Sequence, residues 1–146
     1  MPLIIFTDGA SLGNPGPMGI GVVAYRNQEK VMEMSEYLGE GTNNIAEYTA
    51  VVMALEFARE SGEKDVQIKA DSQLIVRQLN GEYKTRDPKL RALKRKIEEL
   101  RAGMDVRFEH IPREKNGEAD RLSKEGADLG KTKGKTGQQK LVQSWK

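Results

Sequence analysis

The chain has 146 residues, the size of one compact domain, and 37% of them are hydrophobic, which is enough to form a core. It has no cysteine, which excludes disulfides and thiolate metal sites, and it has no apolar run of membrane-spanning length. The N-terminus has no signal-peptide pattern, so we expect a cytoplasmic protein.

The formal net charge is +2, but the charge is unevenly distributed. Residues 129–146 contain five Lys and no acid, whereas residues 1–128 contain 19 basic and 22 acidic residues. We therefore expect a domain over 1–128 that is not a general polyanion binder, followed by a basic C-terminal tail over 129–146. A Lys/Gly/Thr-rich tail is typical of a solvated segment and can also bind nucleic acid. Leu141, Val142 and Trp145 favour a third hypothesis, in which the tail docks on the domain.

The first quarter of the chain predicts three strands. An almost continuous apolar run at residues 3–8 is typical of a buried strand. Residues 9–19 hold four glycines and two prolines, which predicts a loop. Residues 19–26 and 31–38 are rich in β-forming side chains, and the four residues between them predict an antiparallel hairpin.

The rest of the chain alternates predicted helices and strands. Candidate N-caps, glycine stops and apolar periodicity predict helices over 42–61, 72–80, from Pro88 to a stop at Gly103, and over 116–128. Short apolar runs predict strands over 66–70 and 105–111. This order predicts an α/β fold with one mixed five-stranded sheet, in which an antiparallel meander is joined to parallel strands and flanked by helices.

Four acidic residues occupy positions where a charge is costly, because two of them close apolar strands and two lie in helices. They are Asp8, Asp71, Glu47 and Asp120. Charged side chains rarely lie against apolar elements unless they are paired or bind a metal ion. Several carboxylates brought together raise each other's pKa unless a cation neutralises them. The simplest interpretation is a divalent-metal site for phosphodiester chemistry, at the sheet edge where strands end.

Each acid also has a purely structural interpretation. Glu47 follows Asn44 by three residues, as in a capping box, and Asp71 is placed to cap a helix that begins at Ser72. Asp120 alone fits a solvated helix position. Glu47, however, shares its helical face with small apolar residues, which favours a functional acid that lies close to a sheet.

Four segments in order resemble the type 1 ribonuclease H family, and each carries one of the acids. The segments are 6–16 (FTDGASLGNPG), 42–47 (TNNIAE), 70–73 (ADSQ) and 111–122 (IPREKNGEADRL). The resemblance covers roughly residues 3–128 in one register and implies the ribonuclease H-like fold. It also implies an endonuclease that hydrolyses the RNA strand of RNA/DNA hybrids and leaves 5′-phosphate and 3′-hydroxyl ends.

The catalytic acids of the family fall on Asp8, Glu47, Asp71 and Asp120. Carboxylates prefer hard cations, so we expect two Mg²⁺ ions, with Mn²⁺ as a substitute, about 4 Å apart. We assign Asp8 as the bridging ligand, Glu47 and Asp71 to one ion, and Asp120 to the other.

The resemblance also implies a set of residues that contact the hybrid. Asn and Gln side chains both donate and accept hydrogen bonds, which suits recognition of the RNA 2′-hydroxyl. Thr42 matches a residue that contacts a DNA-strand phosphate, although one residue of Thr42-Asn43-Asn44 is also expected to cap the helix. The expected contacts are Gly9, Ala10, Ser11, Asn14, Thr42, Asn43, Asn44 and Gln73. Glycine at 9 is interpreted as allowing close approach of a ligand to the backbone.

Two features depart from the best-known bacterial members. The segment 80–86 is too short for their basic, Lys/Trp-rich insertion that grips the duplex. His110, the single histidine, is preferred as a histidine of the core or one that supports the site indirectly, although its residue count from Asp120 also permits a catalytic role. Arg113 is the preferred residue for assisting product departure, acting electrostatically because Arg does not lose its proton at neutral pH.

Three other interpretations are less favoured by the sequence. Haloacid-dehalogenase-type phosphatases have an Asp two positions before the second Asp, where this chain has Phe6. A non-catalytic nucleic-acid-binding module on the same fold would be favoured by loss of an acid, and all four are present. A domain of a polyprotein or reverse transcriptase is less favoured than a free-standing monomer, given Met1 before the first strand and an ending of Trp145-Lys146.

Overall fold

The computed structural model describes residues 2–132, and it contains one mixed sheet of five strands with helices on both faces. The strand order is β3-β2-β1-β4-β5, with β1, β2 and β3 antiparallel and with β1, β4 and β5 parallel. The elements are β1 (Leu3–Ser11), β2 (Gly16–Arg26), β3 (Glu29–Gly41), α1 (Asn43–Glu60), β4 (Asp65–Ala70), α2 (Gln73–Leu79), α3 (Pro88–Leu100), β5 (Asp105–His110), a 3-10 turn (Arg113–Lys115) and α4 (Gly117–Thr132). The predicted fold class and element order are confirmed.

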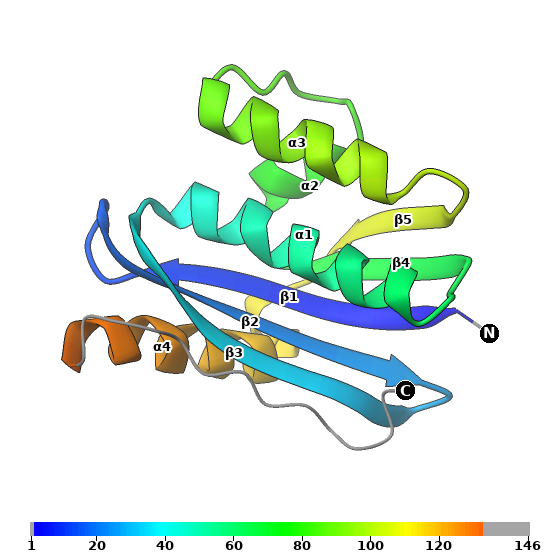
Figure 1. Cartoon of the computed structure of the whole chain (residues 1–146), viewed down its shortest axis with the longest axis horizontal. Coiled ribbons are helices and arrows are strands. Elements are labelled where there is room, and N and C mark those ends of the chain that lie inside the picture. The colour runs from blue at the N-terminus through cyan, green and yellow to red at the C-terminus, as the bar shows by residue number, and fades with distance from the viewer. Residues whose placement is uncertain (1, 133–146) are drawn as a thin grey trace.

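Two layers of helices enclose the sheet unequally (Figure 1). Helix α1 packs on one face and carries nine buried residues, with α3 lying beside it, whereas α4 covers the other face over β2 and β3. The core lies between α1 and the sheet, where side chains such as Leu3, Ile5 and Leu55 are fully buried. None of the helices within residues 2–132 is long and apolar enough to cross a membrane.

The predicted loop over 9–19 is wrong in extent. Strand β1 continues to Ser11, and Ser11 pairs with Met18 of β2, so the connection shrinks to a few residues. The predicted hairpin turn is also shorter, because Asn27 and Gln28 alone form it with φ of 52° and 68°. Strand pairing uses the backbone, so glycines and prolines at strand ends did not prevent extension.

Helix α4 runs past the boundary predicted at residue 128, so that residues 129–132 are helical. Gly130 is buried, and a Cβ added there would lie 1.9 Å from the Tyr37 ring of β3. The first part of the predicted tail therefore belongs to the packed domain. Residues 133–146, with Leu141, Val142 and Trp145, lie outside the described residues, and the hypotheses about the tail stay predictions.

Candidate metal centre

The end of the pairing between β1 and β4 creates the site. Thr7 and Ala70 form the last pair of these two strands, and β1 then continues to Ser11 with only β2 beside it. Asp8 is therefore the first β1 residue with no β4 neighbour, and Asp71 is the first residue after β4. Parallel strands end at the same edge of a sheet, so these two side chains meet in the space that β4 vacates.

Three carboxylates form a cluster in this space. One carboxylate oxygen from each of Asp8, Glu47 and Asp71 lies within 4.8 Å of the others. Asp8 is only 5% exposed, whereas Glu47 and Asp71 are half-buried. Asp120 of α4 joins the group through a hydrogen bond with Asp8, and its own carboxylate lies 3.2 Å from Lys124 Nζ. The structure thus brings all four predicted acids together.

Two glycines allow α1 and α4 to pack closely against the sheet, which places Glu47 and Asp120 near Asp8. A Cβ on Gly9 would lie 2.3 Å from the backbone nitrogen of Glu47, so β1 can approach the first turns of α1 only with glycine there. The Gly9 N–H donates a hydrogen bond to the Glu47 carboxylate. Gly21 pairs with Asp8 across the strands, and a Cβ on it would lie 2.1 Å from the Ala119 carbonyl oxygen of α4. Gly9 is therefore packed closely against a helix, and the approach of a ligand to its backbone stays a prediction.

Burial and mutual repulsion disturb the ionisation of the cluster. Desolvation, the charge of Asp71 and the hydrogen bond with Asp120 raise the pKa of Asp8 to about 7, although the Ser123 hydroxyl lowers it. Desolvation and the charges of Asp8 and Asp71 raise the pKa of Glu47 well above its ordinary value. Within residues 2–132, none of Asp8, Glu47 and Asp71 forms an ion pair. An oxygen-rich group of this kind fits a divalent cation, which would neutralise it.

Sequence reasoning missed two side chains that hold the acids. Asn116 is 1% exposed, and its amide donates to Asp71 Oδ2 and to the Thr7 carbonyl, both at 2.9 Å. The Ser123 hydroxyl lies 3.1 Å from Asp8 Oδ2 and 2.8 Å from the Asp120 carbonyl oxygen. The available signal was their position, because Asn116 directly precedes α4 and Ser123 lies one turn after Asp120.

The capping interpretations of two acids are wrong. Thr42 is the N-cap of α1, and its hydroxyl accepts from Ile45 N at 3.3 Å. Ser72 is the N-cap of α2 and accepts from Ile75 N at 3.3 Å. Glu47 and Asp71 therefore do not cap a helix, and the placement of their charges against apolar elements requires another explanation.

Comparisons with known proteins identify the family. Residues 6–126 match the family model described as "Reverse transcriptase-like". Ribonuclease HI of Halobacterium salinarum is 41% identical over 125 residues, which cover 84% of this chain and 63% of that relative. A structure of LC11-RNase H1 in complex with an RNA/DNA hybrid is 43% identical, with a TM-score of 0.83 over 88% of this chain and 98% of that one. The chain belongs to the type 1 ribonuclease H family.

A mycobacterial relative adds a point about length. The N-terminal RNase H domain of Rv2228c from Mycobacterium tuberculosis superposes with a TM-score of 0.87 at 31% identity, over 92% of this chain and 99% of that one. The chain spans only 36% of the whole curated Rv2228c, which is called a bifunctional protein, and 63% of the Halobacterium relative. The shared region is thus the ribonuclease H domain itself.

The predicted hybrid-binding residues of this ribonuclease H domain gather beside the acids. Asn43 Oδ1 accepts from Ser11 N at 2.8 Å, and Asn14 Oδ1 accepts from Asn43 N at 3.0 Å, which ties the β1–β2 connection to the start of α1. Asn44 and Gln73 are exposed at the starts of α1 and α2. Ala10 is half-buried on β1. Within residues 2–132, the side-chain NH2 groups of Asn14 and Asn43 donate no hydrogen bond.

The expectation that His110 is a core histidine is wrong, whereas an indirect role in supporting the site stays a prediction. His110 ends β5 opposite Ala70 and is exposed, so it is not a histidine of the core. Side chains alternate along a strand, so His110 lies on the same face as Val106 and Phe108, which are buried, whereas His110 at the end of the strand is exposed. Arg113 is exposed on the 3-10 turn, and its charge lowers the pKa of Glu47, so it acts on the acid cluster.

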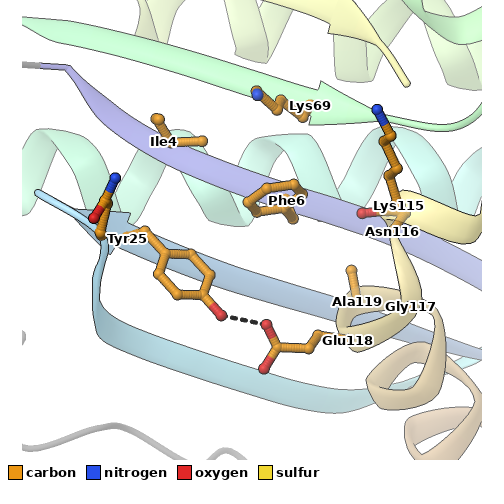
Figure 2. A pocket seen from close by; sticks show the side chains of 10 residues that line it. Ile4, Phe6, Tyr25, Lys69, Lys115, Asn116, Gly117, Glu118 and Ala119 are labelled. Carbon is orange, nitrogen blue, oxygen red and sulfur yellow. Dashed lines mark hydrogen bonds between the residues drawn. The ribbon is translucent and has the colours of Figure 1, made fainter. Parts of the chain in front are cut away.

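A separate pocket lies on the α4 side of the sheet (Figure 2). It has a volume of about 440 Å³ and is formed by Ile4 and Phe6 of β1, Tyr25 of β2 and the start of α4. The Tyr25 hydroxyl donates a hydrogen bond to Glu118, as the dashed line in Figure 2 marks. None of the four acids lines this pocket, so the candidate chemistry lies at the sheet edge beyond Asn116.

Proposed function

We propose that this chain hydrolyses the RNA strand of RNA/DNA hybrids with two divalent metal ions, Mg²⁺ or Mn²⁺ in its place, and leaves 5′-phosphate and 3′-hydroxyl ends. The observation that carries the proposal is the convergence of Asp8, Glu47, Asp71 and Asp120 on one sheet edge. We also propose that the chain acts as a monomer and has a cytoplasmic location.

The four acids would hold the ions. Asp8 would be shared between them, with Glu47 and Asp71 on one ion and Asp120 on the other. Such ions supply activated water on one side of the phosphorus and charge stabilisation for the leaving oxygen on the other. Asp8 must lose its proton to bind, and its raised pKa means that binding competes with protonation near neutral pH.

The surrounding residues would orient these ligands. The Gly9 N–H directs the Glu47 carboxylate toward the cluster, and the Asn116 amide fixes Asp71 against β1. Groups that hold a metal ligand by hydrogen bonds define the ligand's orientation. Because these contacts already exist in the folded chain, little reorganisation is required when cations and substrate bind.

Recognition of the RNA strand would come from the backbone around Gly9–Ser11 and from short neutral side chains beside the cluster. The expected residues are Gly9, Ala10, Ser11, Asn14, Thr42, Asn43, Asn44 and Gln73. RNA differs from DNA by its 2′-hydroxyl, which both donates and accepts hydrogen bonds, and exposed amides such as Asn44 and Gln73 match it. Arg113 would stabilise negative charge as product departs.

One assay tests the proposal. Strand-labelled RNA/DNA, RNA/RNA and DNA/DNA duplexes are incubated with Mg²⁺, Mn²⁺ or EDTA, and the ends of the products are mapped. We expect cutting of the RNA strand of the hybrid with either metal ion, and no cutting in EDTA. Equal cutting of both strands, or cutting in EDTA, would contradict it, and hybrid binding without cutting would favour a non-catalytic module.

A further inference from the structure

A dense group of cations lies on α3 and the loop before it. Residues 84–96 contain seven Lys or Arg and one acid, whereas the remaining residues of 1–128 contain 12 basic and 21 acidic residues. The average over 1–128 conceals this contrast. The domain has one strongly positive segment on an otherwise negative body.

These cations line a groove of about 1040 Å³ between residues 81–86 and one face of α3. The basic residues of the groove are Lys84, Arg86, Arg91, Lys94 and Arg95. None of the five forms an ion pair within residues 2–132. The single acid of the segment, Asp87, accepts from Lys89 N at 2.8 Å as the N-cap of α3.

Two acidic residues at the rim of the groove form ion pairs with arginines that do not line it. Glu82 pairs with Arg77 at 3.4 Å, and Glu98 pairs with Arg101 at 3.5 Å. Two of the three rim acids are thus neutralised locally, and Glu99 is the third. The groove therefore presents an excess of uncompensated positive charge to solvent.

The groove is attached to the helix that carries Glu47. The hydroxyl of Tyr48, the next residue along α1, donates to Gln78 Oε1 at 2.6 Å and lies 3.1 Å from the Thr85 hydroxyl. Tyr48 is fully buried, so this contact holds the loop rigidly on α1. Figure 1 shows α1 and α3 beginning at the same end of the molecule, where β1 ends. The groove follows α3 from Arg91 to Glu99, so it runs from that end of the domain along the helix.

We propose that this groove binds backbone phosphates of the hybrid away from the cleaved bond. It would thereby replace the duplex contacts that the basic insertion makes in the bacterial members. The inference rests on the proposed function. A body with excess acid repels a polyanion at long range, and concentrated exposed cations offset that repulsion where the duplex lies. Arg91 and Arg95 lie one helical turn apart, about 6 Å along the axis, and each can contact a phosphate.

Two charge-matched variants of α3 test the groove. Arg91→Gln/Arg95→Gln removes two exposed groove cations, and Lys89→Gln/Lys96→Gln removes two exposed cations of α3 that do not line the groove. Gln is a good helix former, so both variants should keep the fold, which circular dichroism and melting temperature verify. Binding of a fluorescent 24-base-pair hybrid is measured in EDTA across a KCl series, where no cleavage is expected.

We expect the groove variant to bind the hybrid more weakly and to lower the slope of log K against log salt by roughly 1.8, or about 0.9 per lost phosphate contact. The Lys89→Gln/Lys96→Gln variant should keep the wild-type slope. In Mg²⁺ the groove variant should raise KM and leave kcat unchanged, because the groove does not touch the cleaved bond. Equal slopes for the two variants would overturn the inference.

The outcome separates this inference from the proposed function. If the wild type binds the hybrid but does not cut its RNA strand, the proposed function fails while the slope difference still tests the groove. If the wild type cuts and the groove variant binds with an unchanged slope, the groove inference fails alone. A fall in kcat at unchanged KM would also overturn it, since that would place these residues at the chemistry.

Discussion

The acid cluster and the α3 groove carry opposite charges and are built in opposite ways. The cluster gathers residues 8, 47, 71 and 120 from β1, α1, the end of β4 and α4, whereas the groove cations all lie within residues 84–95. Asp8 is 5% exposed, and Arg91 and Arg95 are exposed. Charges that are costly to bury need the whole fold to hold them, whereas charges that act through solvent need only a local run of sequence.

This difference predicts different responses to mutation. Buried carboxylates influence each other's pKa, so substitutions within the cluster should be large in effect and non-additive. Exposed cations are screened by salt and act nearly independently, so substitutions in the groove should be moderate, additive and dependent on ionic strength. The four predictions below sharpen that contrast or break it.

Asp71→Asn should have the largest effect. Loss of a proposed metal ligand should reduce turnover in Mg²⁺ by at least about 100-fold, since even residues that only support a ligand cost 10- to 100-fold. Hybrid binding in EDTA should be retained, because repulsion of phosphates decreases. Single-turnover cleavage and anisotropy measure the two effects. Activity near that of the wild type would show that Asp71 is not a ligand.

Asn116→Ala should follow. It leaves Asp71 unsupported and deprives the Thr7 carbonyl of its donor, which should reduce activity roughly tenfold and stability by about 1 to 3 kcal/mol. Asn80→Ala is the matched control. The Asn80 amide also donates to a strand carbonyl, that of Phe108, at a distance of 3.3 Å, but it contacts none of the acids. Cleavage rates measure the activity and urea denaturation measures the stability of both variants. Equal activity of the two would show that Asn116 does not support the acid cluster.

Arg113→Ala should reduce turnover about tenfold with little change in the metal dependence, since an exposed cation beside the cluster acts through its charge. His110→Ala is the control on the neighbouring strand end. Because His110 is exposed, its replacement should change stability by less than about 0.5 kcal/mol, in contrast to a histidine of the core. A larger rate loss for His110→Ala would indicate a histidine-assisted reaction.

The last prediction concerns the stability of the metal-free protein rather than the rate of cleavage. The pKa of Asp8 is raised from 3.8 to about 7 in the folded chain, so the folded state binds a proton that the unfolded state releases. As the pH rises from about 4 to about 7, the free energy of unfolding of the wild type should therefore fall relative to that of Asp8→Asn, by at most about 4 kcal/mol. Mg²⁺ should reverse the difference.

Thermal melts across pH, with and without EDTA, check this prediction. Arg91→Gln/Arg95→Gln is the control, because exposed groove cations with no buried partner should give a melting curve that parallels the wild type over the same pH range. A parallel curve for Asp8→Asn as well would mean that Asp8 does not titrate within the cluster, and the contrast between the two regions would lose its electrostatic basis.

Local patterns in the sequence determined the order of the elements, the mixed sheet and the four acids. A buried strand such as 3–8, a helix opened by Pro88 or an Asp that closes an apolar run depends on near neighbours, so each can be recognised before folding. The basic run at 84–96 is equally local, although the net charge of the whole domain conceals it.

Only the tertiary structure decided how the site is assembled. The extension of β1 to Ser11, the need for glycine at 21 and the bridge of Asn116 between Thr7 and Asp71 each depend on a partner distant in sequence. Backbone approach distances and the satisfaction of buried polar groups are properties of packed surfaces, and no local pattern of side chains encodes them.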